Sequence, residues 1–125
     1  MEIVEATAPP AGTAPAGSAT VLADHPCIGW TYAYGSTGCF QAYGDVIWAM
    51  DTKADGMSAA VIVNTNYGRA PYACVNSMGN GTSGRCDKDY WESGDVRLQV
   101  LRYDYDTKNF YQPEAWSGWL PVDGQ

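Results

Sequence analysis

The sequence predicts an all-β protein: an antiparallel β-sandwich or small barrel of about eight strands, with two local disulfides and an extended N-terminal leader. Short apolar or alternating runs are separated by clusters of turn formers, a spacing typical of sandwiches and barrels. No window of useful length has helical periodicity. Four cysteines form two pairs with the same twelve-residue spacing, Cys27/Cys39 and Cys74/Cys86.

Residues 1–26 are predicted to be the leader, and residues 27–125 one β domain. The segment 9–19 is rich in proline, alanine and glycine, a composition that cannot form a core. Before it, residues 2–7 are β-prone, with Ile3 and Val4 as apolar side chains. Such a peptide can add to a sheet edge or fill a partner's cleft, so Ile3 and Val4 are candidate partner-binding residues. A disordered remnant or a self-packed tail is the alternative.

The first half of the domain contains four expected strands, at residues 28–34, 39–43, 46–50 and 57–65. Alternation in the first places Trp30, Tyr32 and Tyr34 on one face. Trp48 in the third is a candidate for the buried core tryptophan. The fourth has the most β-branched residues and is expected to lie in the centre of a sheet.

The stretch 72–90 is predicted to be a disulfide-clamped hairpin. Turn formers fill residues 76–84, and a reversal near Asn80 places Cys74 opposite Cys86 on antiparallel strands. Closing so short a loop stabilises the fold by roughly 3 kcal/mol on the chain-entropy model. Pairing of sequence neighbours is therefore preferred among the three possible connectivities, with buried free thiols as the alternative.

The last strands are expected at residues 96–103, 110–112 and 116–122. In the first of these, Val96, Leu98 and Val100 alternate toward the core. Pro113 is expected to end the second. The third is predicted to be an edge strand, because Pro121 has no backbone N–H to donate to a central ladder.

Two disulfides indicate an oxidising compartment, so a secreted, extracellular protein is expected. No signal peptide is recognised, which favours a mature form. The net charge of −7 argues against nucleic acid and anionic membranes as partners. No run reaches transmembrane length.

The sequence gives no sign of enzymatic chemistry, and we assign no catalytic residue, cofactor or metal. His25 is the only histidine, and no serine lies in a Gly-x-Ser-x-Gly elbow. His25 is also the only histidine that could join the cysteines around zinc, so a zinc site is not expected. Fourteen acidic residues make a chance carboxylate pair uninformative.

Aromatic residues are frequent, with five Trp, nine Tyr and two Phe. Small β cores use many of them, but Trp, Tyr and Arg also anchor interfaces with protein, and flat rings stack on sugars. The candidate partner-binding residues of the domain are two aromatic rows and one loop: Trp30 and Tyr32, Tyr103 and Tyr105, and Tyr67 with Arg69. An ordinary loop stacked on the sheet edge is the alternative for the last pair.

Several strings occur together within residues 27–122: Gly38-Cys39-Phe40, Asp45, residues 51–59, Tyr67-Gly68-Arg69, Cys74-Val75-Asn76, Cys86-Asp87 and Trp116-Ser117-Gly118-Trp119. With them the chain resembles small secreted two-disulfide β-proteins of filamentous actinobacteria. Some members resemble the small adaptor of the umbrella-shaped toxin particles of Streptomyces, which joins a lectin-bearing subunit to the repeat ring of the large toxin subunit. The resemblance implies an adaptor in a hetero-complex with other secreted proteins, with the leader docked on one of them.

The first functional expectation is therefore a secreted, non-enzymatic protein-binding module. The second is an inhibitor of a hydrolase, with the loop 76–84 or the leader inserted into a cleft, because a stapled loop is pre-organised. The third is a carbohydrate-binding module that stacks a glycan on Trp and Tyr side chains.

Overall fold

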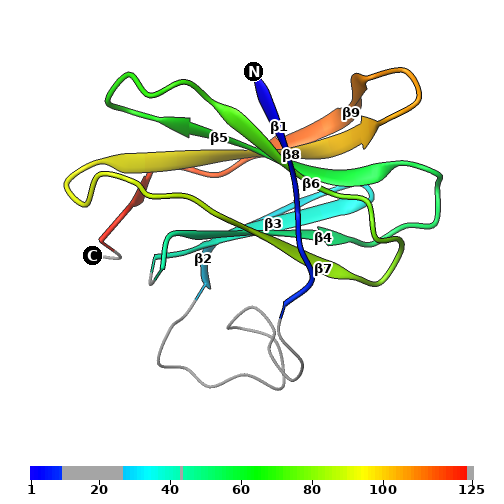
Figure 1. Cartoon of the computed structure of the whole chain (residues 1–125), viewed down its shortest axis with the longest axis horizontal. Coiled ribbons are helices and arrows are strands. Elements are labelled where there is room, and N and C mark those ends of the chain that lie inside the picture. The colour runs from blue at the N-terminus through cyan, green and yellow to red at the C-terminus, as the bar shows by residue number, and fades with distance from the viewer. Residues whose placement is uncertain (10–26, 43, 124–125) are drawn as a thin grey trace.

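The computed structural model describes residues 1–9, 27–42 and 44–123. Within these residues, ten strands form two sheets that pack face to face (Figure 1). The all-β prediction is confirmed, and the arrangement is the sandwich. None of the described residues lies in a helix that could cross a membrane.

The larger sheet has the order β1-β6-β5-β8-β10, and β9 also pairs with β8. Only the β1–β6 pair is parallel among the described strands of this sheet. β9 and then β10 pair with successive parts of β8, where Trp116 is the partner of Gln99 and Leu120 that of Val96. The bounds are Glu2–Glu5 for β1, Ser58–Thr65 for β5, Tyr72–Asn76 for β6, Asp95–Asp104 for β8, Asn109–Trp116 for β9 and Leu120–Pro121 for β10.

The smaller sheet has the order β2-β3-β4-β7 and is antiparallel. Its strands are β2 (Cys27–Ala33), β3 (Ser36–Gln41), β4 (Val46–Asp51) and β7 (Ser83–Asp87). A bulge in β2 lies between Ile28 and Thr31, where Gly29 has a φ of 69°. We call the two layers the six-stranded sheet and the four-stranded sheet.

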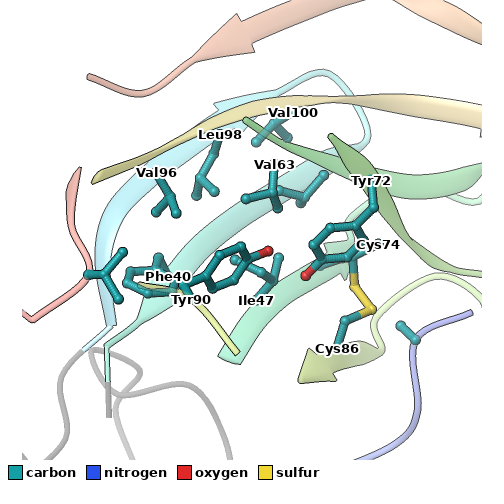
Figure 2. Packing of buried hydrophobic residues seen from close by; sticks show 14 residues of the cluster. Phe40, Ile47, Val63, Tyr72, Cys74, Cys86, Tyr90, Val96, Leu98 and Val100 are labelled. Carbon is teal, nitrogen blue, oxygen red and sulfur yellow. A yellow bond between two sulfur atoms is a disulfide. The ribbon is translucent and has the colours of Figure 1, made fainter. Parts of the chain in front are cut away.

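The main core fills the space between the sheets. Val96, Leu98 and Val100 of β8 are buried as predicted, and Figure 2 shows them across from Phe40 and Ile47 of the four-stranded sheet. Full burial of each such side chain contributes roughly 1.5–3 kcal/mol. Because successive side chains of β8 point to opposite faces, the residues between these three point to the outer face of the sheet.

The first strand is part of the fold. Val4 pairs with Cys74 of β6 and packs against the core. The chain then passes from the six-stranded to the four-stranded sheet (Figure 1), where Thr7 pairs with Arg85 of β7. The β-prone segment thus adds to an edge of its own sheets. Residues 10–26, which include His25 and most of the expected leader, lie outside the described residues.

Both disulfides form between the predicted neighbours, with Cα–Cα distances of 5.8 Å for Cys27–Cys39 and 6.0 Å for Cys74–Cys86. They are consistent with an extracellular or secreted protein. The prediction of a hairpin at 72–90 is wrong, however. Cys74 lies in the six-stranded sheet and Cys86 in the four-stranded sheet, so this disulfide joins the two layers.

The reason for this crossover is that both edges of β6 are occupied, one by β5 and the other by β1. β7 must therefore pair elsewhere, and it pairs with β4. Asn76, fully buried at the end of β6, fixes the crossover. Its amide donates to the carbonyl oxygens of Ala49 and Thr82, both at 3.0 Å.

One further expectation needs correction. Pro113 does not end its strand, since β9 runs to Trp116 with a bulge in which residues 112–114 oppose the single residue Leu101. An edge strand tolerates this because its outer groups have no ladder to complete. Trp48 is buried as predicted, and it packs with the Cys27–Cys39 disulfide in a core cluster on the other face of the four-stranded sheet.

Candidate binding surface

The outer face of the six-stranded sheet carries an apolar layer of its own. On β5, β6 and β8, the side chains that point away from the main core form a second buried cluster: Ala60, Ile62, Ala73, Val75, Leu101 and Tyr103, with Phe110 packed against it. Antiparallel sheets commonly present polar side chains on their outer face. This face is therefore built differently from an ordinary solvated one.

One row of this face runs across five strands. The register places Ile3, Ala73, Ile62, Gln99 and Trp116 side by side, in the order β1-β6-β5-β8-β9. Ala73 and Ile62 in the row are buried, whereas Ile3 is 37% exposed at one end and Trp116 is 47% exposed at the other. Large apolar side chains are thus displayed at both ends of a buried strip.

Beside this row, Arg97 of β8 contacts two tryptophans. Its guanidinium carbon lies 4.6 Å from the ring centroid of Trp116 and 4.8 Å from that of Trp119. These are cation–π distances, and such contacts contribute roughly 0.5–1 kcal/mol at exposed sites. Trp119 is 45% exposed, so both rings remain open to a partner. We call Trp116, Arg97 and Trp119 the Trp–Arg–Trp platform.

The segment that carries the platform is fixed to β8 and to the core. Ser117 donates its N–H to the carbonyl oxygen of Leu98, and its hydroxyl oxygen accepts the N–H of Leu98, both at 2.9 Å. Leu120 then packs against the main core over Gly29. A Cβ on Gly29 would lie 2.3 Å from Leu120 Cδ1, so only glycine leaves room for this anchor.

A carboxylate orders the side chains around Trp116. Glu114 accepts hydrogen bonds from Gln112 Nε2 at 2.6 Å and from Gln99 Nε2 at 2.9 Å. The hydrogen bond from Gln112 is the main cause that lowers the pKa of Glu114, and Trp116 and Gln99 act in the same direction. A carboxylate whose position is fixed by hydrogen bonds therefore lies beside the exposed indole of Trp116.

At the other end of the face, Tyr105 ties β1 to β8. Its ring packs edge-on against the buried Tyr103 with a centroid distance of 5.0 Å, and its hydroxyl donates to the carboxylate of Glu5. Burial, followed by the hydrogen bond and charge of Glu5, raises the pKa of the Tyr105 hydroxyl, which keeps its proton available for that bond. Ser77 also donates to Glu5.

The predicted partner-binding residues fall in three places. Ile3, Tyr103 and Tyr105 belong to the outer face of the six-stranded sheet, and Val4 points into the core. Trp30 and Tyr32 stack with a centroid distance of 6.5 Å on the outer face of the other sheet, where Tyr32 is 68% exposed.

Tyr67 and Arg69 lie in the loop after β5. The Tyr67 ring contacts Trp91 edge-on at 5.4 Å, and its hydroxyl oxygen accepts the N–H of Trp91 at 2.9 Å. Arg69 stacks on Tyr90 at 4.8 Å. Trp91 is 63% exposed, so this loop presents a second ordered tryptophan.

Sequence reasoning missed the platform itself and Trp91. The string Trp116-Ser117-Gly118-Trp119 was noticeable, but the sequence predicted only an edge strand there. Alternation within β8 does place Arg97 outward. What no local pattern supplies is the pairing of β9 and β10 with β8, which brings Arg97 between the two tryptophans.

A cavity of about 410 Å³ lies between the β4–β5 and β6–β7 loops, and its lining includes Asp51, Lys53, Ser77 and Asn80. Burial is the main cause that raises the pKa of Asp51. The residues that line this cavity include no His or Cys. Among the described residues, no three His, Cys, Asp or Glu side chains converge as metal ligands would.

Comparison of the chain with protein-family models, with curated proteins and with solved structures finds no match. Function must therefore be argued from the surface itself.

Proposed function

We propose that this protein is a secreted, non-enzymatic protein-binding module that contacts another secreted protein through the outer face of its six-stranded sheet. The observation that carries the proposal is the Trp–Arg–Trp platform: two nearly half-exposed indoles, held in place by Arg97 and by the Ser117–Leu98 hydrogen bonds. Trp, Tyr and Arg are the residues that most often dominate the energy of protein interfaces.

Pre-organisation supports the same conclusion. Each rotamer-rich side chain immobilised on binding costs about 0.5–1.5 kcal/mol. Here Trp116 and Trp119 already lie against Arg97, and Glu114 is already hydrogen bonded. A partner that covers the platform therefore loses less free energy to ordering than it would on a mobile surface.

A protein partner is favoured over a sugar because of the position of Arg97. A pyranose ring stacks on an open aromatic face, and the guanidinium occupies one face of each indole. At the far end of the row Ile3 is 37% exposed, so exposed apolar side chains extend beyond the area that a single sugar covers.

The adaptor role implied by the resemblance needs a second contact surface. The loop with Tyr67 and Trp91 supports it, because Trp91 is ordered by Tyr67 and yet is the most exposed of the five tryptophans. This loop shares no residue with the platform, and it adjoins the start of β8 through the hydrogen bond from Val122 N–H to the Gly94 carbonyl oxygen. We therefore assign the platform to one partner and the Trp91 loop to another.

The test compares two matched variants of the full chain. Trp116→Ala/Trp119→Ala removes the platform, and Trp91→Ala is the control that also removes exposed tryptophan. Each protein is used to capture partners from culture medium, captured proteins are identified by mass spectrometry, and the Kd for a purified partner is measured by calorimetry.

For the platform partner we expect the double variant to weaken binding by about 30-fold or more, the effect of losing hot-spot side chains worth at least 2 kcal/mol. Trp91→Ala should leave that Kd unchanged. An unaltered Kd in the correctly folded double variant would reject the platform, and binding confined to a glycan array would reassign the surface to carbohydrate.

A further inference from the structure

We propose that β1 is an exchangeable strand, which can leave its position along β6 and β7 and occupy the same position in a second copy of this chain. We call this position the β1 seat. It is formed by residues 72–75 of β6 and residues 84–86 of β7. The proposal concerns self-association and does not depend on the proposed function.

The seat binds a continuous segment across both sheets. Residues Glu2 to Glu5 pair in parallel with Tyr72 to Val75. Beyond them, the N–H of Ala6 donates to the carbonyl oxygen of Val75 at 2.7 Å, and Thr7 exchanges two backbone hydrogen bonds with Arg85, both at 2.9 Å. Six residues thus form one ladder that ends on the second sheet.

The seat is shaped to this particular segment. Val4 packs against the main core, and Ala6 is only 4% exposed. A Cβ on Gly84 would lie 2.7 Å from the Cβ of Ala6, so glycine in β7 makes room for alanine in the segment. Side chains set the register at both ends, through an ion pair of 3.2 Å between Lys88 and Glu2 and through the hydrogen bonds of Glu5.

The occupant to which this seat is complementary is therefore the chain's own residues 2–7. A second copy carries the same segment and would make identical contacts. This argues for a second copy as the partner of the seat, in preference to an unrelated strand that would need valine, alanine and glutamate at the same spacing.

The connection to the rest of the chain is long enough for exchange. Nineteen residues, 8–26, join Thr7 to Cys27, and fully extended they reach about 60 Å. Thr7 pairs with β7 at one edge of the four-stranded sheet, and Cys27 lies in β2 at the other edge. That separation is about four strand spacings, about 19 Å. The chain length thus exceeds what its own seat requires by about threefold.

The balance between own and exchanged strands is set by concentration. Because the contacts are the same in both states, the own strand is favoured only by its effective concentration, which is in the millimolar range for tethered segments. We accordingly expect the full chain to be monomeric at micromolar concentration. Shortening the connection below the required span removes the intramolecular option and leaves exchange as the way to fill the seat.

The experiment deletes residues 10–26, which leaves two residues between Thr7 and Cys27, a reach of about 10 Å. Light scattering after size exclusion should give twice the monomer mass, or a closed higher multiple, for the shortened chain. A Gly/Ser linker of the original length should restore the monomer. The shortened chain with Val4→Asp and Ala6→Asp, whose segment fits no seat, should also be monomeric.

A shortened chain that remains monomeric with native circular dichroism and no free thiols would overturn the proposal. If the shortened chain does not fold, a refolding experiment on the full chain tests the proposal instead. Two differently tagged copies are unfolded with disulfides intact, mixed at about 1 mM and refolded. Mixed dimers recovered through both tags are the expected result, and they should be lost with Val4→Asp/Ala6→Asp. Their absence from the wild-type mixture would reject exchange.

Discussion

Gly38 of β3 faces the six-stranded sheet at a position that leaves no room for a larger side chain. A Cβ there would come within 2.6 Å of Val61 Cγ2 and 3.0 Å of Val100 Cγ2. We expect Gly38→Ala to lower the free energy of unfolding by about 1–3 kcal/mol, the usual cost of overpacking a core. Urea denaturation measures this. Gly118→Ala, with no atom within 4 Å of the added Cβ, should change it by less than about 0.5 kcal/mol.

Asp45 is a buried carboxyl whose pKa is raised above 3.8, mainly by loss of hydration and further by Asp89. Its Oδ2 accepts the N–H of Tyr90 at 2.9 Å, which together with Arg69 opposes the rise. Oδ1 is buried without a hydrogen-bond partner among the described residues. The carboxyl thus binds its proton more tightly in the folded protein than in the unfolded chain.

This sets the sign of a pH effect. The contribution of Asp45 to stability is complete below pH 3.8 and is lost as pH rises through the higher folded pKa. Asp45→Asn removes the titration, and asparagine tolerates the φ of 54° at this position. We expect the unfolding free energy of the variant, relative to wild type, to increase with pH above 3.8. A difference that is the same at every pH would contradict this account.

At the scale of elements, the two disulfides close loops of equal length but fix different parts of the sandwich. The chain-entropy model gives about 3 kcal/mol for each. Cys74→Ala/Cys86→Ala should, in addition, speed amide hydrogen exchange in β7 and at Ala6 and Thr7, because this bridge joins the sheet edges that β1 spans.

Cys27→Ala/Cys39→Ala is the matched control. It should lower global stability by a similar amount, but its local effect on exchange should lie in β2 and β3, which that bridge connects within one sheet. Identical exchange maps for the two double variants would show that the position of the bridge does not matter.

The positions of most strands could be predicted because apolar and polar residues alternate along them, as at Val96, Leu98 and Val100. Strand partners could not. The turn formers between Cys74 and Cys86 correctly indicate a reversal, but the same residues serve a hairpin and a crossover between sheets. The choice depends on β1 and β5, which lie far away in sequence and occupy both edges of β6. Pro113 was misjudged because its edge position depends on the same kind of information.

At the scale of the whole molecule, the chain has a net charge of −7, and few of its described carboxylates form ion pairs. The described residues hold three, and the pair Arg85–Asp87 and the pair Lys88–Glu2 each include a largely exposed carboxylate. Pairs of this kind contribute about 0–1 kcal/mol. Repulsion among the remaining carboxylates should therefore dominate the response to salt.

We expect the Tm at pH 7 to rise when NaCl increases from about 10 mM to about 500 mM, since salt screens this repulsion. Calorimetry at pH 4.3, near the isoelectric point, is the control, and there the rise should be smaller. A Tm that falls with salt at pH 7 would mean that the ion pairs, Arg102–Asp55 above all, outweigh the repulsion.

The candidate surface was predictable only in part, because local sequence patterns do not determine which strands pair. Alternation identifies which side chains of a strand share a face, so Tyr103 and Trp30 were recognised as candidates. It does not say that Tyr103 and Ile3 lie on one sheet while Trp30 lies on the other. The platform depends on three strands meeting, which only the folded chain defines.

The two indoles beside Arg97 also provide an intrinsic fluorescence signal that would report binding at the platform. Trp48 is sealed from solvent, whereas Trp116 and Trp119 are open to it and rest against a cation. Iodide or acrylamide would quench the open rings and spare the sealed one. A ligand seated on the platform would shield those rings and shift their emission, so occupancy could be followed by intrinsic fluorescence without any label.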